Sequence, residues 1–294
     1  MASAIEWTDE TWNPTVGCTK ISPGCKFCYA EVMHRRLTAM GQVKYSEPFG
    51  CPRPWPDHLK LPLSWPGSRM VFVNSMSDLF HDAFGFEYVA AVFGVMAGCP
   101  QHTFQVLTKR PERMLEFFRW LEAQRRGYMH EHRGLLWDCL SQIAGKPVRD
   151  LAAGQAFKAR DGDAIPQSIG DMCAWRWPLP NVWLGTSVEN ADYLPRVDSL
   201  RQCPAAVRFL SCEPLLGPLD GLDLNGIHWV IAGGESGHKA RPMAMDWARQ
   251  IRDQCIDAEI PFFLKQLGGR RGKRGGSQAL LDGRTWNEWP PPPA

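Results

Sequence analysis

The stretch "NVWLGTSVEN", residues Asn181–Asn190, shows most plainly how this chain folds. Its first half is apolar without alternation, and its second half ends in Ser187, Glu189 and Asn190. A strand with one face in water alternates apolar and polar residues, whereas an unbroken apolar run is typical of a parallel strand covered on both faces. In parallel α/β folds the chemistry gathers at the carboxyl ends of strands. The stretch therefore predicts a buried parallel strand that ends at a site.

The same pattern recurs along the chain, with helical patterns between the repeats. Further strands are predicted at Met70–Asp78, Thr103–Arg110, Val207–Pro214, His228–Gly237 and Ile260–Gly269, with a weaker first strand in "TWNPTVGC" (11–18). Amphipathic helices are predicted at Ala30–Met40, Phe86–Met96, Glu112–Gln124 and Asp246–Ala258. Strands alternating with helices indicate an α/β fold with right-handed crossovers.

The number of these units favours one barrel over an open sheet. About seven strand–helix units fit a partial or full (β/α) barrel. No G-x-G-x-x-G follows the first strand, which argues against a dinucleotide-binding doubly wound sheet. The predicted fold class is therefore α/β, a TIM-barrel-like partial or full (β/α) barrel with inserted loops.

Three segments interrupt the rhythm without suggesting a second core. Residues 41–69 are rich in proline and tryptophan and are predicted to form a long ordered loop. Residues 125–180 are an oversized connection that carries charge, glycine and proline. We expect a single barrel domain over 1–267, followed by a basic and then proline-rich tail at 268–294 that is partly disordered.

Composition gives no global indication of a charged partner. The 294 residues are 44% hydrophobic and 22% charged, with a net charge of +2. No run approaches the ~20 apolar residues that span a bilayer, and the N-terminus has acidic residues where a signal peptide needs a basic region. We expect a cytoplasmic protein with no membrane partner. In that reducing compartment, ten cysteines indicate free thiols or metal ligands rather than disulfides.

Polar residues end every predicted strand. The loops that follow the carboxyl ends of the strands converge on one open end of the barrel, called the mouth below. Each of them alone has an ordinary alternative role, which is to cap a helix or satisfy a loop backbone. Together they predict an active site or a charged ligand at the mouth. They are Asn74, Ser75 and Asp78; Thr108, Lys109 and Arg110; Ser187, Glu189 and Asn190; Ser211 and Glu213; Glu235 and Ser236; and Lys265 and Gln266.

Cysteines follow the first predicted strand in "VGCTKISPGCKFCYAE" (Val16–Glu31), with the spacing C-x6-C-x2-C. As zinc ligands they need a fourth partner, which Cys51 or a histidine (His34, His58 or His81) would have to supply. As plain structural thiols they need none. As iron–sulfur ligands, Cys18, Cys25 and Cys28 would hold three irons of a four-iron cube and leave the fourth open to a small molecule.

The segment "CKFCYA" resembles the cluster loop of the radical S-adenosylmethionine (SAM) superfamily, whose fold is a partial (β/α)6 barrel. The usual loop of that superfamily is C-x3-C-x2-C, and its glycine-glycine-glutamate motif on the second strand is absent here. Nearly the whole chain also resembles an uncharacterised phage- and prophage-borne family that is usually placed beside these enzymes. The segments that carry this second resemblance are "EWTDETWNPTVGCTKISPGCKFCYAE", "VFVNSMSDLFH", "HTFQVLTKRPERM", "NVWLGTSVEN", "RFLSCEPLLGP", "WVIAGGESG" and "PFFLKQLGG".

The resemblance implies a [4Fe-4S] cluster on the three cysteines, SAM as second cofactor, and a reduced flavodoxin or ferredoxin as electron donor. The released 5′-deoxyadenosyl radical would modify a substrate. The cofactor-binding residues implied are Asn74, Ser75 and Asp78 for the methionyl part, Ser187 and Glu189 for the ribose, and Tyr29 for shielding the cluster or packing on adenine. Candidate catalytic residues are Lys109, for a carboxylate or phosphate, and Glu213 and Glu235, for substrate contact or acid–base work.

Two questions stay open at the level of sequence. The substrate is not written in the chain, although the cluster of Arg270, Arg271, Lys273 and Arg274 and the phage-borne setting favour a nucleic acid or nucleotide. The alternative function is an iron–sulfur or zinc protein that does not cleave SAM and that serves as a nucleic-acid-binding partner.

Overall fold

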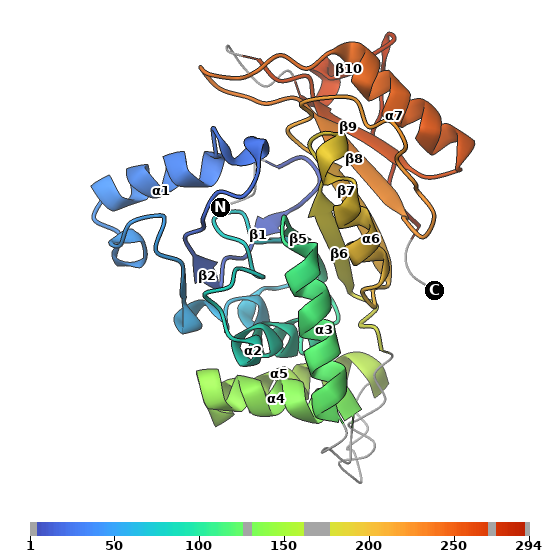
Figure 1. Cartoon of the computed structure of the whole chain (residues 1–294). Helices are drawn as coiled ribbons and strands as arrows, with labels where there is room; N and C mark the ends of the chain where they lie inside the picture. Colours follow the sequence, from blue (N-terminus) through green and yellow to red (C-terminus); the bar gives the residue numbers. More distant parts are fainter. Residues whose placement is uncertain (1–4, 126–130, 162–176, 270–274, 292–294) are drawn as a thin grey trace.

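The computed structural model describes residues 5–125, 131–161, 177–269 and 275–291. Its centre is a curled sheet of seven parallel strands in the order β1-β4-β5-β6-β7-β8-β9 (Figure 1). The strands are β1 (Glu10–Thr11), β4 (Met70–Val73), β5 (Thr103–Thr108), β6 (Val182–Ser187), β7 (Val207–Cys212), β8 (Trp229–Gly233) and β9 (Phe262–Gln266). The predicted parallel α/β fold is thus confirmed as a half-barrel surrounded by helices. The weak first strand lies just before the predicted position.

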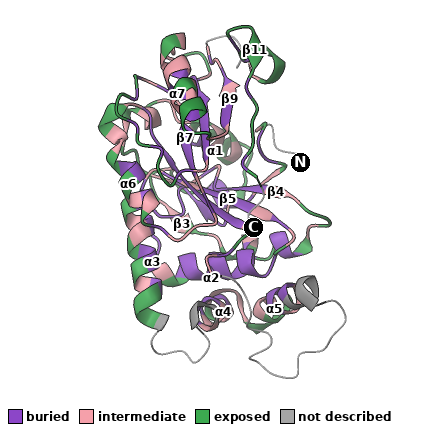
Figure 2. Cartoon of the chain, turned by 90° about the vertical axis from the view of Figure 1, so that its right-hand side faces the viewer, coloured by how far each residue is buried: buried purple, intermediate pink, exposed green. Residues whose placement is uncertain are grey.

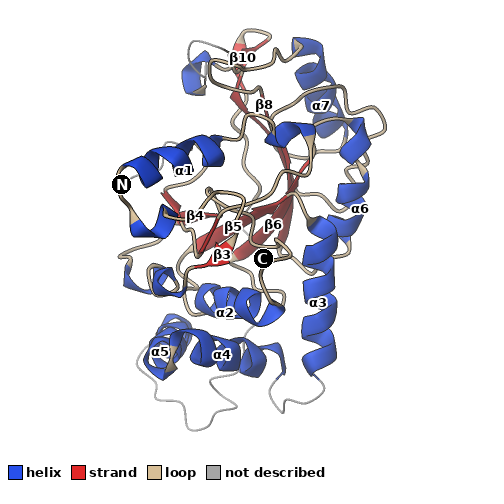
Figure 3. Cartoon of the chain, turned by 60° about the vertical axis from the view of Figure 1, so that its left-hand side comes forward, coloured by secondary structure: helices blue, strands red, loops and turns tan. Residues whose placement is uncertain are grey.

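Helices follow most of the strands. They are α1 (Tyr29–Ala39), α2 (Phe86–Ala97), α3 (Pro111–Arg125), α4 (Glu131–Ala144), α5 (Lys146–Asp161), α6 (Pro195–Arg201) and α7 (Met245–Asp257). The four predicted helices are confirmed within two residues at each end. The sequence did not predict α6, nor α4 and α5 in the segment 125–180 (Figure 3).

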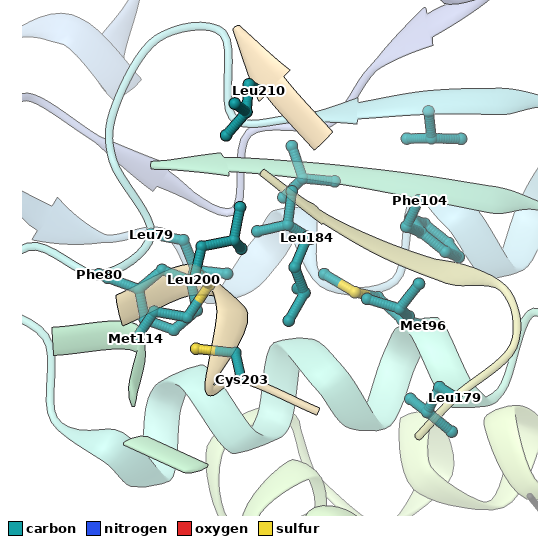
Figure 4. Close-up of a cluster of buried hydrophobic side chains, with 14 of the residues drawn as sticks. Leu79, Phe80, Met96, Phe104, Met114, Leu179, Leu184, Leu200, Cys203 and Leu210 are labelled. Atoms are coloured by element: carbon teal, nitrogen blue, oxygen red, sulfur yellow. The ribbon is translucent and has the colours of Figure 1, made fainter. Parts of the chain in front are cut away.

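The strands are apolar throughout because each sheet face has its own hydrophobic core. Side chains alternate across a strand, so Phe104, Leu184 and Leu210 point outward to the helices, where they pack with residues such as Met96 and Met114 (Figure 4). Figure 2 shows the sheet as an almost fully buried layer. This two-sided burial is the physical cause of the unbroken apolar runs.

The concave face of the sheet is filled by aromatic rings. Phe72, Trp183, Phe209 and Trp229 line it, and Trp7 enters from the N-terminal segment. The Trp7 ring lies 4.8 Å from Phe72 and 6.3 Å from Trp229, centroid to centroid. These rings make a closed floor, so the polar residues that follow the strands stand above an apolar surface.

The helices of the insertion pack beside α2, not over the carboxyl ends of the strands (Figure 1). Two glycines of the α2 segment permit the close approach: a Cβ on Gly94 would lie 2.8 Å from the backbone oxygen of Leu136 in α4, and one on Gly98 would lie 2.6 Å from Cβ of Ala152 in α5. Gln155 of α5 also donates to the backbone oxygen of Leu63. The segment 125–180 is therefore an extra helical layer, with residues 126–130 and 162–176 outside the described part.

The described part of the tail packs on the sheet. The hairpin of β10 (Leu280–Leu281) and β11 (Arg284–Thr285) follows β9, and the Leu264 amide donates to the Trp286 carbonyl. Trp289 stacks on Trp229 with ring centroids 5.0 Å apart. The folded unit therefore extends past residue 267, the limit expected from the sequence, and the basic cluster 270–274 lies outside the described residues. No helix of the described chain is long and apolar enough to cross a membrane.

We expect Gly98→Ala to lower the free energy of unfolding by about 1–3 kcal/mol, because the new methyl group overpacks the contact between α2 and α5. Gly154→Ala in α5 is the matched control, since its Cβ would meet nothing within 4 Å and alanine favours a helix by roughly 0.5–1 kcal/mol over glycine. Urea unfolding of the two variants measures the difference. Equal stabilities would contradict the packing described for the insertion.

Candidate functional site

The inward-facing residues at the carboxyl ends of the strands form a polar ring above the aromatic floor. Ser187 of β6 and Ser211 of β7 are register partners, so their side chains share one face. The same alternation places Lys109 after β5, Glu213 after β7 and Lys265 of β9 on the inner side. The predicted convergence of these strand ends is therefore present in the structure.

The cysteine loop reaches this ring from the first edge of the sheet. Strand β2 (Thr15–Val16) pairs with β3 (Arg53–Pro54) and leads into Gly17, which has a φ of +81° and leaves no room for a side chain beside the Phe49 carbonyl. The Cys18 amide then donates a hydrogen bond to the Phe49 carbonyl oxygen over 2.9 Å. Cys25 ends the short 3-10 helix Pro23–Cys25, and Cys28 is the N-cap of α1.

A buried carboxylate, Glu189, docks this loop on the sheet. Its Oε1 accepts hydrogen bonds from Ser22 Oγ over 2.7 Å and from Lys109 Nζ, and its Oε2 accepts from Arg196 over 2.9 Å. Gly24 lies so close that a Cβ there would stand 2.4 Å from Oε1. The side chain is fully buried. Burial would raise the pKa of Glu189, but the charge and hydrogen bond of Lys109 outweigh it, so the pKa lies below its usual value.

A second ion pair, between Arg110 and Asp78, holds the beginning of the cysteine loop at Thr19. Arg110 donates to Asp78 over 3.1 Å, and also to the Thr19 carbonyl over 3.1 Å and to Cys18 Sγ over 3.6 Å. Asp78 in turn accepts from Thr108 Oγ1 and from the Phe80 and Lys109 amides. Asp78 therefore organises the loops after β4 and β5, and its predicted contact with a methionyl group stays a prediction.

The three cysteines are half-buried free thiols that influence one another electrostatically. Burial, and then the Asp78 charge, raise the pKa of Cys18 to about 12 despite the opposing effect of Arg110. Burial likewise raises the pKa of Cys28. Burial opposes ionisation of Cys25 too, but hydrogen bonds from Ile21 and Ser22 and the charge of Lys109 bring its pKa below the usual value.

The three cysteines do not form a site for one metal ion. In the described part of the chain, no group of three or more His, Cys, Asp or Glu side chains is arranged to hold a single ion. Each thiolate of an iron–sulfur cube binds a different iron. The ligands of a cube are therefore more widely spaced than the ligands of one ion. The arrangement of these side chains thus argues against a single metal ion, and it does not bear on a cluster.

Asn74 at the end of β4 has an unused acceptor. Its Nδ2 donates to Thr15 Oγ1 over 2.6 Å and to Ser77 Oγ over 2.9 Å. Its Oδ1 is buried and has no hydrogen-bond partner. Ser75, next along the chain, is occupied by hydrogen bonds with the Asn13 side chain. An acceptor in this position fits a ligand that brings an N–H donor to the mouth.

The two candidate catalytic glutamates have different surroundings. Oε1 of Glu213 lies 3.1 Å from Lys265 Nζ, an ion pair without a hydrogen bond of normal geometry, and Oε2 accepts from Ser211 over 3.3 Å. Glu235 is bound by both ends of the Arg241 guanidinium, over 2.9 and 2.6 Å. Glu213 thus keeps an acceptor that makes no hydrogen bond, while Glu235 is committed to Arg241.

Arg241 also connects the loop after β8 to the cysteine loop, because its guanidinium lies 5.4 Å from the centroid of the Phe27 ring. The contacts of Ser22, Arg196 and Arg241 were not expected from the sequence. Arg196 lies inside α6, seven residues after Glu189, and no sequence signal marks it as a partner. Tyr29 is 64% exposed at the start of α1, outside the ring of polar residues.

Fold and site together define an α/β half-barrel with a three-cysteine loop at the carboxyl ends of its strands. The chain belongs to the family described as "Protein of unknown function (DUF5131)", whose model matches residues 2–290. No curated protein matches the chain. No solved structure matches it either.

We expect Glu189→Gln to destabilise the protein by about 3–5 kcal/mol, because Lys109 and Arg196 then lose their countercharge in a buried place. The depressed pKa means that Glu189 contributes its full stability above its unfolded value of 4.5, and loses it as the pH falls through the folded pKa. The gap between wild type and variant should therefore shrink on acidification. Denaturant unfolding from pH 7 to pH 3 measures this gap.

Glu116→Gln is the control for that series, since Glu116 is 58% exposed and, among the described residues, pairs with Arg113 alone. It should cost less than about 1 kcal/mol. A gap for Glu189→Gln that stays constant with pH would show that the pKa of Glu189 is the same in the folded and unfolded protein, and a gap that grows on acidification would show that folding raises this pKa.

Proposed function

We propose that this protein is a radical SAM-like enzyme in which Cys18, Cys25 and Cys28 bind a [4Fe-4S] cluster. The observation that carries the proposal is a half-buried loop of three cysteines that is bound to Arg110 after β5 and to Glu189 after β6, and in which Cys25 acts electrostatically on both Cys18 and Cys28. Of the other cysteines in the described part, Cys51 is exposed and the rest are buried in the core, at Cys99, Cys139, Cys203, Cys212 and Cys255. Three nearby thiols suit a cluster that keeps one iron open.

The surroundings of the cysteines fit such a group. Thiolates add negative charge, and Lys109 and Arg110 both act electrostatically on the cysteines. The loop is fixed at two points, at Thr19 by Arg110 and at Ser22 by Glu189, so its thiols are held before a ligand arrives. The free Oδ1 of Asn74 suits the amino group of SAM, and it ends the second strand of the sheet, the position expected for that contact.

When bound, the cluster and SAM would supply a 5′-deoxyadenosyl radical for hydrogen abstraction, after one-electron reduction. The chain itself positions and shields. The aromatic floor below Lys265 keeps water from reaching the mouth from inside the barrel. Glu213, with Lys265 beside it, is the carboxylate available to accept or return a proton of the substrate. Glu235 acts on the substrate only if Arg241 releases it.

The substrate class we propose is a nucleic acid or nucleotide, with Lys109 or Lys265 as the cation nearest a phosphate at the mouth. The basic cluster of Arg270, Arg271, Lys273 and Arg274 supports this choice, because its positive charge would attract a phosphate backbone.

The cysteine assignment is tested by anaerobic reconstitution with iron and sulfide. Replacing Cys18, Cys25 or Cys28 by Ala should abolish the cluster and the production of 5′-deoxyadenosine from SAM after reduction. Cys99→Ala should preserve both, because Cys99 is buried beside α5. Iron and zinc analysis with the absorption spectrum gives the metal content. A wild type that holds a four-iron cluster yet never cleaves SAM would leave the non-SAM iron–sulfur function in its place, and a purified protein with zinc on the same cysteines would refute the cluster.

Loop position is tested separately by Gly24→Ala. The new methyl group collides with Glu189, which cannot move aside because Ser22, Lys109 and Arg196 hold it. We expect retention of iron against a chelator to fall by about tenfold, the usual scale for disturbed supports of metal ligands. Gly50→Ala, in the neighbouring loop and with nothing within 4 Å of its Cβ, is the control. If both variants retain iron equally, the docking of the loop on Glu189 has no part in cluster binding.

A further inference from the structure

Helix α1 begins at the residue after the third cysteine and carries an unusual exposed apolar face. Its inner face packs through Ala30 and His34 on the loop that contains Tyr45. Its outer face presents Val32, 45% exposed, and the chain continues with Met40, 71% exposed. Helical spacing puts Tyr29, Val32, Arg36 and Met40 on one side of the helix.

The segment of residues 20–43 is the main concentration of exposed apolar residues in the described chain. Of the nine large hydrophobic residues exposed in that described chain, three are the residues of this face, Tyr29, Val32 and Met40, and two more, Ile21 and Val43, lie in the loops on either side of α1. Single exposed apolar residues are normal, whereas a contiguous group rimmed by polar residues marks a surface for another protein.

The rim of this surface is basic. Lys20, Lys26, Arg35 and Arg36 are exposed, and Glu31 is the single acidic residue of the loop and helix. Glu31 is shared between Lys20, 2.8 Å away, and Arg35, 3.0 Å away. Lys26 and Arg36 have no carboxylate partner among the described residues. Because the whole chain has a net charge of only +2, this segment holds an excess of positive charge that the remainder lacks.

The first turn of α1 stands directly beside a cysteine, because Cys28 is the N-cap of the helix and Tyr29 is its first residue. A hollow of about 690 Å³ lies on another side of α1, where His34 and Arg35 face residues 46–50 and where Cys18 and Thr19 form part of the wall. A protein that covers the outer face of α1 would therefore lie next to Cys28.

We propose that the α1 face, defined by residues 20–43, is the docking surface for an acidic one-electron carrier protein. The inference rests on the proposed function, because a cluster that is reduced by one electron needs a donor that comes close to it. Electron-transfer complexes bury little area and depend on complementary charge for orientation and rate. The apolar centre favours a protein over a nucleic acid, whose recognition would rely on cations without exposed valine and methionine.

The experiment compares two reductants on the reconstituted full chain. Dithionite reduces without docking, and a reduced acidic flavodoxin requires it. The test variant is Val32→Glu with Arg36→Glu on α1. The matched control is Leu151→Glu with Arg149→Glu on α5, where Leu151 is exposed and Arg149 is half-exposed and paired with Asp150, with the same change of charge on a different helix. Circular dichroism and thermal unfolding show that both variants fold.

We expect dithionite to reduce the cluster and give equal 5′-deoxyadenosine in all three proteins. With flavodoxin at low salt, the rate should fall at least about tenfold in the α1 variant, should be unchanged in the α5 variant, and should fall with added salt in the wild type. An unchanged flavodoxin rate in the α1 variant, or an equal loss in both variants, overturns the docking surface and leaves the proposed function standing. A protein without a dithionite-reducible cluster overturns the proposed function and the docking together.

Two other occupants would also overturn the proposal. If sedimentation shows that the wild type is a dimer and the α1 variant a monomer, the surface is covered by a second copy of the chain. If a DNA or RNA oligonucleotide binds the wild type and not the α1 variant, the surface serves nucleic acid.

Discussion

The carboxylate of Glu189 is the interaction on which the site depends. It is fully buried, and an isolated charge in such a place would be very costly. Lys109, Arg196 and Ser22 together make the charged form the stable one, as the depressed pKa indicates. Because these partners come from the loop after β5, from α6 and from the cysteine loop, one side chain joins three separate segments. The cysteines therefore have a fixed position relative to the sheet.

The sheet could be predicted because burial on both faces leaves a direct mark on sequence. Runs such as Val182–Ser187 are apolar on successive residues, since the odd positions meet the aromatic floor and the even positions meet the helices. The helices α4 and α5 also leave a mark, at the spacing of a helix: Leu135, Leu136, Cys139 and Leu140 are buried in α4, and Ala152, Ala153 and Ala156 in α5. The charge, glycine and proline around these residues hide that periodicity. The close approach to Gly94 and Gly98 comes from tertiary packing against a segment far away in the chain.

The hydrogen-bond partners of the polar residues could not be predicted from the sequence either. Polar residues at strand ends predicted where the site would lie, but not which of them would be free. Arg196 and Arg241 are placed by loops whose paths have no periodicity, unlike helix neighbours at three or four residues. For that reason Glu189 and Glu235 looked available to a cofactor or substrate, and in the fold both are bound to arginine.

The division between occupied and unoccupied groups is what separates a site from ordinary loop capping at these strand ends. Asp78 behaves as a cap, since it accepts two backbone amides as well as Arg110. Asn74 Oδ1 has no hydrogen-bond partner, and Glu213 Oε1 has only the charge of Lys265. Capping alone would satisfy every buried group, because an unpaired one costs about 1–3 kcal/mol. Other unpaired buried atoms lie away from these strand ends, such as His102 Nδ1 and Gln254 Oε1. Asn74 Oδ1 and Glu213 Oε1 differ from them because they directly follow β4 and β7, where a bound ligand would remove that cost.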